Sequence, residues 1–589
     1  MKTGSDLDLI VQKKALEQIS ARVESWQDNF SPFFEEFEEY ASFFRLIESS
    51  RSSKAPNTFT RTRVGETIRA TEALTTSIYR MLTSNEPCYD LQNLSMTQSS
   101  QTMFNAHLLL RYQDYLIKWR RRLLRSIRNM CLFGTTIVET PYVMKYRFGR
   151  LEWEALGFVP RSLLQCAFEP NIIYIEETPW MAFLDYYTED QLLTKADEDP
   201  EHWDPIMIQK AIEETKNKST ASTKVEERRR KAGYRELPLY EVCTYYGRLK
   251  GLPREDQKLW MVRVVNMTVP VYAGPNPSPT GEIPMKVARY LDFELEPYGY
   301  GVGRLGRLAQ RHMDANRERY MDVATMSLMN MWIKDRLSGI RNSELKIRPL
   351  GIIEADDVNG IKPYSPDPNS IQFGLKLEEI FKAEHQGNTG ATPNLQAQAT
   401  GASATESSIA QNEAIRRVSV IAEDAAESLI RDYQMEKHEY NKAWLQMDRF
   451  ISMPGMEKPS RVNRTSIAAE LAVFVKITTD KDFRPERLKG LIQAYQTITS
   501  IRQRPNVLLD ELPIAEEIFR MLDVSPKKVI RDQNDLAPNS VLNMLIQAKQ
   551  NAQTGAQEMG GEVAERLNEA GVPGASVADT PVGPTALTP

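Results

Sequence analysis

The N-terminal part of the chain places its hydrophobic residues at helical spacing. Across residues 5–29, apolar side chains recur close to the 3.6-residue period of an α-helix, at Leu9, Ile10, Leu16, Ile19, Val23 and Trp26. Residues 30–46 alternate Phe and Tyr with Glu, and this pattern predicts a segment that docks on another surface, such as a neighbouring subunit. Further helices are predicted over residues 67–82 and 102–130, so the first 135 residues are predicted to be helical.

From residue 135 the pattern changes to the two-residue alternation of β-strands. Strands are predicted at 135–140, 142–148 and 151–155, and β character continues at 171–175 and 180–184. Residues 210–231 indicate a polar helix or loop, and a second β block covers 239–293. One more strand, 471–477, precedes helices at 484–501, 512–522, 525–533 and 541–552. The predicted fold class is therefore mixed α+β and mainly helical.

Residues 297–421 have the most distinctive order of elements. A glycine-punctuated segment, 297–306, begins a helix over residues 304–332, and a short β-prone insert follows at 340–368. A second helix is predicted at 370–385. Residues 385–405 then contain no Asp, Glu, Lys or Arg, and a third helix runs from 408 to beyond 445. Two helices that flank a small insert, followed by an uncharged loop, are typical of a structural part that lines a passage.

Composition narrows the class of protein. A chain of 589 residues with 41% hydrophobic and 26% charged residues has room for several ordinary globular cores. The net charge of −5 argues against a protein that clamps nucleic acid over a broad basic face, but it is compatible with DNA that merely passes by. The four cysteines lie far apart without metal or disulfide spacing, which favours a reducing cytoplasm. No segment resembles a signal peptide, and no membrane span is expected.

One short motif raises the question of enzyme chemistry. Gly301-Val-Gly-Arg-Leu-Gly306 matches the G-x-G-x-x-G pattern of dinucleotide-binding loops. Such a site needs a strand before the motif and a parallel strand after it, whereas Glu296-Pro297 precedes this one and helix continues behind it. We therefore attribute the glycines to a sharp turn from sheet into helix and to close packing. P-loop, H-E-x-x-H and G-x-S-x-G motifs are absent from the sequence, and we predict no enzyme activity, no cofactor and no metal.

Residues 119–128, Trp-Arg-Arg-Arg-Leu-Leu-Arg-Ser-Ile-Arg, form the strongest basic cluster. These arginines would neutralise phosphates if they bound DNA. Alternatively, they form the polar face of a helix whose apolar face carries Leu116, Leu123, Leu124 and Ile127. We favour this second interpretation.

The order of features resembles that of the portal proteins of tailed bacteriophages over residues 5–530, and the length is similar to that of portals from short-tailed phages. Residues 132–139 (LFGTTIVE) resemble the family's helix-to-strand transition into the wing, and residues 265–272 (VNMTVPVY), Asn276-Pro277 and Ile283-Pro284 resemble the sheet before the stem. Residues 298–303 (YGYGVG) are similar to the aromatic-Gly-x-Gly step into the first stem helix. Residues 400–408 (TGASATESS) resemble the step from the channel loop into the long wing helix.

The resemblance implies a portal-like fold in a ring oligomer of twelve subunits. Residues 1–298 and 404–480 would form the wing, 299–331 the first stem helix, 332–369 the clip and 370–387 the second stem helix. Residues 388–403 would be the channel loop and 481–552 the crown helices, while 553–589 are predicted to lack fixed structure. The portal would be assembled in the host bacterial cytoplasm and lie at one capsid vertex of the virion.

The function implied is a channel through which a terminase motor packages viral double-stranded DNA and through which the DNA is later ejected. The implied partners are the terminase large subunit, major capsid and scaffolding proteins, adaptor and tail proteins, and DNA without sequence specificity. Two alternatives remain open: a soluble nucleotide-binding enzyme that uses Gly301–Gly306, and another ring-forming virion scaffold protein.

The resemblance also assigns candidate site residues. The channel loop would present Asn388, Thr389, Thr392, Asn394, Gln396, Gln398, Thr400 and Ser403 to the DNA. The clip would dock the terminase and adaptor through Lys334, Arg336, Arg341, Lys346, Arg348, Glu354, Asp356 and Asp357. A hinge at the start of the stem would comprise Gly299, Gly301, Gly303 and Gly306.

Overall fold

The described part of the chain is a mixed α+β unit in which helices predominate. The computed structural model describes residues 13–47, 62–85, 87–93, 100–147, 150–217, 240–249, 259–328, 331–334, 361–364, 369–393, 416–452, 459–468 and 470–476. The chain divides into two compact units, Met1–Asp480 and Lys481–Pro589, and all described residues belong to the first. More than half of the described residues are helical, which confirms the predicted class of mixed α+β, mainly helical.

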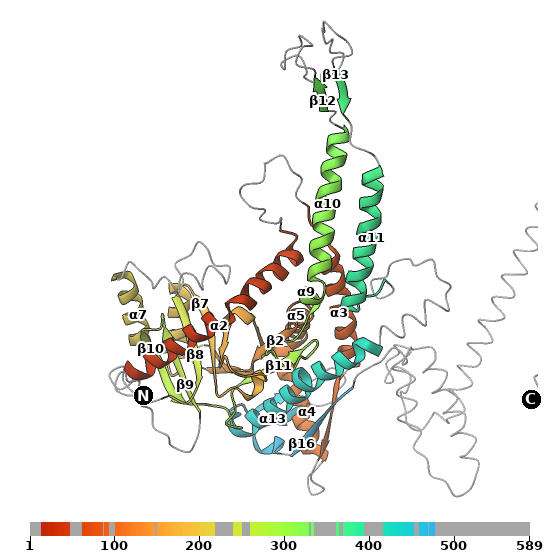
Figure 1. Ribbon diagram of the computed structural model, residues 1–589. Coiled ribbons are helices and arrows are strands. Elements are labelled where there is room, and N and C mark those ends of the chain that lie inside the picture. The colour runs from red at the N-terminus through yellow and green to blue at the C-terminus, as the bar shows by residue number, and fades with distance from the viewer. Residues whose placement is uncertain are drawn as a thin grey trace, which may run out of the picture. The chain divides into compact units, whose positions relative to one another are not determined.

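The main elements are named by their order along the chain (Figure 1). The α-helices are α2 (Lys13–Arg45), α3 (Glu66–Thr83), α4 (Ser100–Leu116), α5 (Trp119–Phe133), α6 (Glu189–Glu198), α7 (Pro205–Asn217), α9 (Val302–Leu305), α10 (Arg307–Leu328), α11 (Asn369–Thr389) and α13 (Tyr433–Trp444). The strands are β1 (Tyr89–Asn93), β2 (Thr135–Glu139), β3 (Tyr142–Arg147), β4 (Arg150–Leu156), β5 (Val159–Arg161), β6 (Cys166–Phe168), β7 (Trp180–Tyr187), β8 (Tyr240–Gly247), β9 (Trp260–Val265), β10 (Val269–Pro275), β11 (Met285–Arg289), β12 (Met331–Lys334), β13 (Ile361–Tyr364), β14 (Arg449–Ile451), β15 (Ser460–Val462) and β16 (Leu471–Val475).

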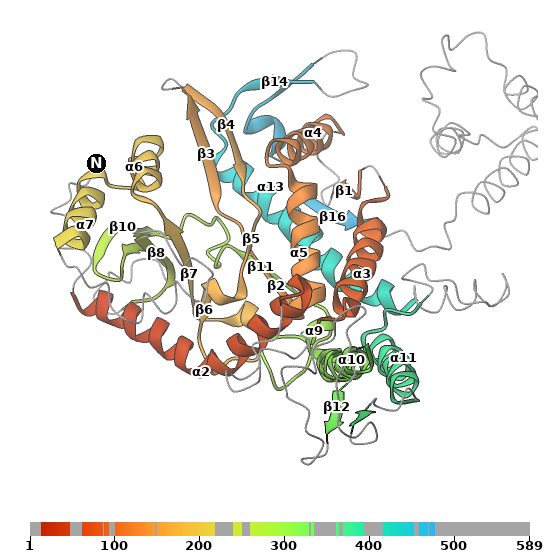
Figure 2. The same ribbon diagram turned by 90° about the horizontal axis from the view of Figure 1, so that it is seen from above.

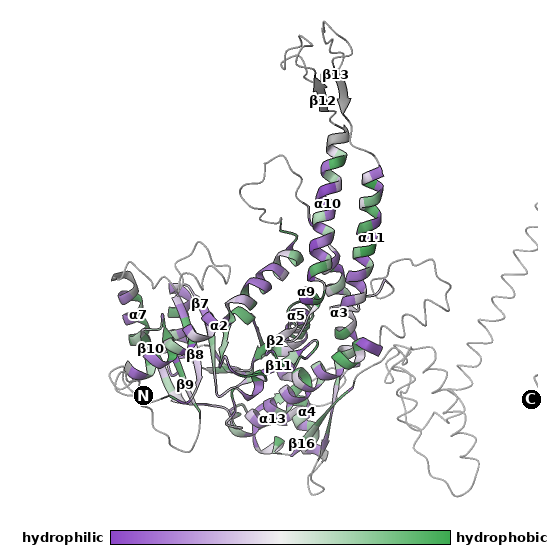
Figure 3. Cartoon of the chain, viewed as in Figure 1, coloured by the Kyte–Doolittle hydropathy of each residue, from purple (hydrophilic) through white to green (hydrophobic). Residues whose placement is uncertain are grey.

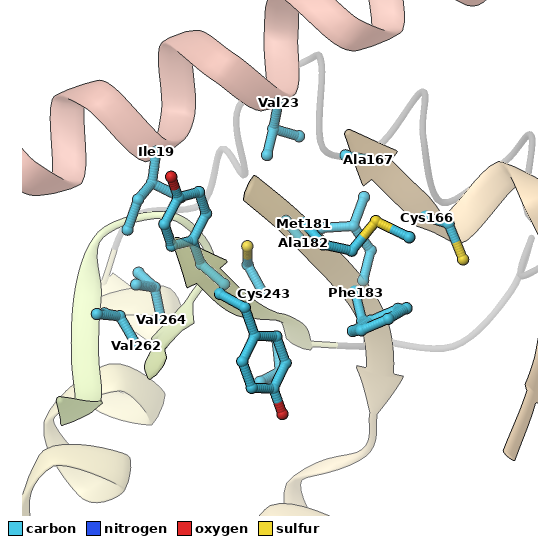
Figure 4. Close-up of a cluster of buried hydrophobic side chains, with 14 of the residues drawn as sticks. Ile19, Val23, Cys166, Ala167, Met181, Ala182, Phe183, Cys243, Val262 and Val264 are labelled. Atoms are coloured by element: carbon cyan, nitrogen blue, oxygen red, sulfur yellow. The ribbon is translucent and has the colours of Figure 1, made fainter. Parts of the chain in front are cut away.

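A five-stranded antiparallel sheet, in the order β10-β9-β8-β7-β6, packs against the long helix α2. Figure 2 shows α2 along one side of this sheet and α6 and α7 on the other. Ile19 and Val23 of α2 point into the apolar layer above the strands, where Met181 and Val264 lie (Figure 4). Helix α2 therefore packs on one face of the sheet.

The aromatic stretch of α2 belongs to the same core, which corrects the expectation that residues 30–46 dock on a separate surface. Phe30, Phe34 and Phe37 are buried, and the ring centroids of Phe30 and Phe168 lie 5.1 Å apart. Tyr298 packs edge-on against Phe37 at 5.2 Å. Every third or fourth residue of a helix lies on the same face, so the alternating Phe and Glu residues form one apolar face that the chain itself covers.

A three-stranded antiparallel sheet, β11-β2-β5, joins the body to the segment that follows it. β2 begins directly after α5, and Gly134 between them has a φ of 88°, the left-handed region that glycine adopts without strain. Strand β11 pairs with β2 in the antiparallel direction and places Arg289 opposite Thr135. The chain therefore leaves β11 beside the point where α5 ends.

Three local predictions for the first half of the chain were wrong. The predicted helix 102–130 is interrupted at Lys118, whose φ of 54° separates α4 from α5. The N-terminal region also contains strand β1, which pairs with the distant β16, for example at Tyr89↔Val475. Residues 171–175 form no strand, and a short 3₁₀-helix, Ile175–Glu177, begins there. Local periodicity does not reveal β1, because its partner strand lies far away in the sequence.

Helices α10 and α11 lie side by side and project from the body, with the β12–β13 ribbon at their far end (Figure 1). The predicted first helix, 304–332, is divided into α9 and α10, and it ends at Leu328 before strand β12. The predicted second helix, 370–385, continues to Thr389. In the predicted insert 340–368, the described residues form strand β13, which pairs with β12 at Met331↔Tyr364.

The predicted long third helix comprises helical residues 416–426, a π-helical segment (Glu427–Asp432) and α13. It packs through Leu429, Ile430 and Tyr433 into a second core that contains residues of α3 and α5. Its predicted start at residue 408 lies outside the described residues. The predicted crown helices over 481–552 and the tail 553–589 also lie outside them.

Candidate functional site

The base of the α10–α11 hairpin begins with glycines that lie in direct contact with backbone atoms. The N–H of Gly299 donates to Thr135 Oγ1 at 2.8 Å, and the N–H of Tyr300 donates to the carbonyl of Leu291 at 2.8 Å. A Cβ atom at Gly301 would overlap the backbone nitrogen of Gly134, and one at Gly299 would lie 2.7 Å from the Gly134 carbonyl oxygen. The chain therefore approaches the end of α5 as closely as two backbones can.

The next two glycines contact side chains from other elements. A Cβ atom at Gly303 would lie 2.5 Å from the ring of Tyr40, and one at Gly306 would overlap the imidazole of His385. Tyr40 comes from α2 and His385 from α11. Close packing, one of the two roles predicted for these glycines, therefore applies at all four positions.

A buried polar network attaches α10 to the chain that leads into α3. Asp314 accepts the N–H of Val64 at 2.8 Å and pairs with the Arg63 guanidinium at 2.7 Å. The Gln310 side-chain amide donates to the Val64 carbonyl at 2.8 Å and to Asp314 at 2.9 Å. Burial raises the pKa of Asp314, although the Val64 N–H and Arg63 act in the opposite direction. These bonds hold one side of the hairpin base in place.

His385 on α11 completes this network from the other helix. The Thr67 hydroxyl donates to Gln310 Oε1 at 2.8 Å, so its oxygen is available to accept a hydrogen bond from the N–H of His385 Nε2, 3.4 Å away. This arrangement assigns the ring proton to Nε2 and leaves the buried Nδ1 without a hydrogen bond. Burial lowers the pKa of His385 to about 4, although the Glu66 carboxylate acts in the opposite direction. The ring is therefore neutral at neutral pH.

The last turn of α11 is also attached to the body. The Gln386 amide donates to Glu66 Oε1 at 2.8 Å, which links α11 to the first turn of α3. The Tyr290 hydroxyl, just after β11, donates to the carbonyl of Thr389 at 3.2 Å. Because both helices are attached at their bases, the hairpin is a rigid extension of the body.

Ion pairs stabilise the hairpin further along its length. Arg307 bridges Glu36 and Glu39 of α2 at 2.7 and 2.8 Å, respectively. Farther out, Arg317 of α10 pairs with Glu378 of α11, and the Tyr320 hydroxyl donates to the same carboxylate at 2.7 Å.

Hydrophobic residues occur along both helices of the hairpin, coloured green in Figure 3, and several of their large side chains are exposed. On α11, Phe373 is 64% exposed and Ile380 is 60% exposed. On α10, Leu308 is 65% exposed. Phe373 and Ile380 are seven residues apart, so they lie on the same side of the helix. Apolar side chains on a two-helix projection are typical of a surface that another molecule covers.

The structure describes only part of the predicted site residues. Of the channel-loop residues, Asn388 is exposed, whereas Thr389 is buried in the last turn of α11 and Thr392 is half-buried. Among the clip residues, Lys334 lies at the end of strand β12. The residues outside the described part are Asn394, Gln396, Gln398, Thr400, Ser403, Arg336, Arg341, Lys346, Arg348, Glu354, Asp356 and Asp357.

The residues that anchor the hairpin were not predicted; they are Arg63, Glu66, Thr67, Gln310 and Asp314. Arg63 and Asp314 are 251 positions apart, and no motif links them. Within α10, the polar residues Gln310 and Asp314 were the available sign of such an anchor.

The basic cluster of α5 is a helix face. Leu123 and Ile127 are buried, Arg122 donates to the carbonyl of Phe158 at 3.0 Å, and Arg128 pairs with Glu72 at 2.7 Å. Arg121 and Arg125 remain exposed.

Comparison with protein-family models gives no match, and comparison with curated protein sequences gives none either. Within the described ranges, no helix has the length and apolar character needed to cross a membrane. The same residues contain no group of three or more His, Cys, Asp or Glu side chains arranged to hold a metal ion.

Proposed function

We propose that this chain is the subunit of a ring-shaped portal, a channel at one capsid vertex through which a terminase packages viral double-stranded DNA and through which the DNA later leaves. The observation that carries this proposal is the α10–α11 hairpin. It is firmly attached at its base, yet it has large apolar side chains exposed along its length. The order of the elements around it, from glycine turn to helix, ribbon and returning helix, agrees with the stem and clip that the resemblance implies.

The exposed apolar residues favour self-association of this hairpin. A two-helix projection buries little apolar surface by itself, and a neighbouring copy would cover Phe373 and Ile380. If copies meet through two different surfaces and the rotation between them closes, the product is a ring. The 22 residues of α10 extend about 33 Å, enough for a ring of hairpins to enclose a channel.

The charge pattern supports a channel in which DNA can slide. The chain has a net charge of −5, and residues 385–405 carry no Asp, Glu, Lys or Arg. His385, the titratable residue of that stretch, is buried and neutral. A loop without cations does not bind phosphates through ion pairs, so it would not hold the DNA in place.

The packing of the glycines argues against the nucleotide-binding alternative. In a dinucleotide site, glycines leave room for the pyrophosphate to approach the backbone. Here the equivalent space at Gly301, Gly303 and Gly306 is filled by Gly134, Tyr40 and His385. In addition, all strand pairs within the described residues are antiparallel. The second alternative, a ring-forming virion scaffold, differs from a portal in having no terminase contact.

We propose that the portal lies in the virion and that terminase and adaptor proteins dock at its clip. Capsid and scaffolding proteins would contact the wing. Mixed basic and acidic residues at the clip would favour such recognition through complementary charge.

Native mass spectrometry tests the proposal directly. We expect wild-type protein to form particles of about twelve times 67.3 kDa, with a central hole in electron micrographs. Phe373→Asp combined with Ile380→Asp is expected to weaken association at least tenfold. Gln372→Asp, at an exposed polar position of the same helix, is the control and should assemble normally.

A folded wild-type protein that stays monomeric across concentrations, alone and with scaffolding protein, would contradict the proposal. Rings that neither bind terminase nor support packaging would favour the scaffold alternative.

A further inference from the structure

A second exposed apolar surface lies beside the base of the hairpin. In the segment Leu291-Asp-Phe-Glu-Leu-Glu296, all of the first five residues are exposed, and Leu295 is 77% exposed. Ile173 and Tyr174 are each 42% exposed, and Arg289, which pairs with Asp292 of this segment, lies over the ring of Tyr174. We call these residues the acidic-apolar surface, because the exposed acidic residues Glu176, Glu177, Asp292 and Glu294 lie beside the apolar ones in the sequence.

The acidic-apolar surface is held in a fixed conformation by two arginines. Arg289 binds both carboxylate oxygens of Glu176, at 2.9 and 2.8 Å, and its guanidinium lies 6.0 Å from the ring of Tyr174. Arg304 pairs with Glu296 and lies 4.0 Å from the ring of Tyr300, which packs on Phe293. A surface that is already ordered loses little conformational entropy on binding.

The same chain carries a surface of complementary charge. Tyr115, at the end of α4, is 79% exposed, more than any other large hydrophobic residue that the structure describes, and Leu295 follows it. Lys118, Arg121 and Arg125 are exposed next to it at the start of α5. We call this the basic surface. Arg121 and Arg125 belong to the sequence's strongest basic cluster, and neither forms a salt bridge or a side-chain hydrogen bond with the part of the chain that the structure describes.

The two surfaces lie near opposite ends of α5. The acidic-apolar surface is near the C-terminal end, where a Cβ atom at Gly299 would contact the carbonyl oxygens of both Gly134 and Leu291. The basic surface extends from the N-terminal end of α5 to Arg125, so its residues lie about 12 to 22 Å along the helix from the C-terminal end. One molecule cannot bring the two together, whereas two molecules can. Contact between unlike surfaces is the head-to-tail type that builds rings.

We propose that the acidic-apolar surface of one copy binds the basic surface of the next, with Tyr115 packed against Leu295 and the arginines of α5 against Glu177 and Glu294. This inference rests on the proposed ring, in which each copy presents two different surfaces to its neighbours. It gives the basic cluster a role in assembly and none in binding DNA.

Charge reversal and its rescue test the contact. Arg121→Glu with Arg125→Glu, and separately Glu177→Lys with Glu294→Lys, should each weaken association at least tenfold in dilution experiments followed by mass photometry. The four changes together should restore most of the wild-type affinity, since the opposite charges again face one another. Asp197→Lys with Glu198→Lys on α6 reverses two exposed acidic residues elsewhere and should have no effect. Circular dichroism and thermal melting establish that each variant is folded.

The outcomes separate this inference from the proposed function. Rings that form normally with either reversed pair would overturn the contact and leave the portal proposal intact, as would a fourfold variant no better than the doubles. Failure of the wild-type protein to form rings would overturn both. Loss of DNA binding by the reversed α5 variant, with ring formation unchanged, would assign the cluster to nucleic acid instead.

Discussion

His385 lies directly against Gly306, so closely that a Cβ atom at position 306 would overlap the imidazole ring. Gly306 immediately precedes α10, and His385 lies one turn before the end of α11. The contact therefore sets the distance between the two helices at the base of the hairpin, where the ring also meets Thr67 of α3.

Gly306→Ala should separate these two helices and destabilise the protein. Because His385 is buried and cannot move aside freely, we expect a loss of about 1–3 kcal/mol in the free energy of unfolding. Urea denaturation at matched protein concentration measures this free energy.

Gly387→Ala is the matched control, since a Cβ atom there would meet no atom within 4 Å. Alanine favours helix over glycine, so this variant should gain up to about 1 kcal/mol. Equal effects at the two positions would contradict the close contact.

Acid should weaken the hairpin base through His385. Burial lowers the pKa of this side chain to about 4, whereas an unfolded histidine titrates near pH 6.5. Between these values the unfolded chain binds more protons than the folded chain, so stability falls as the pH falls. The contribution is fully present above pH 6.5 and decreases by about 1.4 kcal/mol per pH unit down to about pH 4.

The experiment compares the wild-type protein with His385→Gln from pH 7.5 to pH 4.5. The variant should lose stability less steeply with acid, because glutamine does not titrate. The raised pKa of Asp314 acts in the opposite direction, since a carboxyl that takes up its proton more readily when folded gains stability as the pH falls. The contribution of Asp314 to the pH dependence is common to both proteins and cancels when their free energies of unfolding are subtracted. Identical slopes would show that His385 is not neutral and buried.

Asp314→Ala should be among the most damaging single changes at the hairpin base. It removes the carboxylate that pairs with Arg63 Nη1 and that accepts the Val64 N–H, at a cost of about 3 kcal/mol. Arg63→Ala combined with Asp314→Ala should cost less than the sum of the single changes, by at least about 1 kcal/mol. A double-mutant cycle in urea measures this coupling. Strict additivity would indicate that the two residues act independently.

Deletion of residues 394–403 should leave ring assembly intact and impair packaging or retention of DNA. This segment belongs to the proposed channel loop and lies beyond the anchored end of α11. A deletion that begins at Thr389 should also disturb assembly, because Thr389 is buried and its carbonyl accepts the Tyr290 hydroxyl. Particle mass and the DNA content of filled heads distinguish the two deletions. Loss of rings in the shorter deletion would remove the loop from its proposed place in the channel.

Several elements were predictable from the sequence because their signals are local. The 3.6-residue period of α3 and the aromatic and aliphatic runs of β7, β8 and β9 are present in consecutive residues, whatever the rest of the chain does. The glycines at 299–306 likewise indicate close backbone approach without any knowledge of the atoms approached. Sequence alone thus determined the mixed α+β class and the order of helix, ribbon and helix in the hairpin.

Tertiary structure decided which surfaces meet. The aromatic face of α2 was evident from its spacing, but only the fold shows that the chain's own five-stranded sheet covers it. Strand β1 exists because β16, nearly 400 residues later, provides its hydrogen-bonding partner. Arg63, Asp314 and His385 carry no local signature, because their contributions to stability come from burial and from partners distant in the sequence. Periodicity is a property of neighbouring residues, whereas desolvation and pairing are properties of the folded chain.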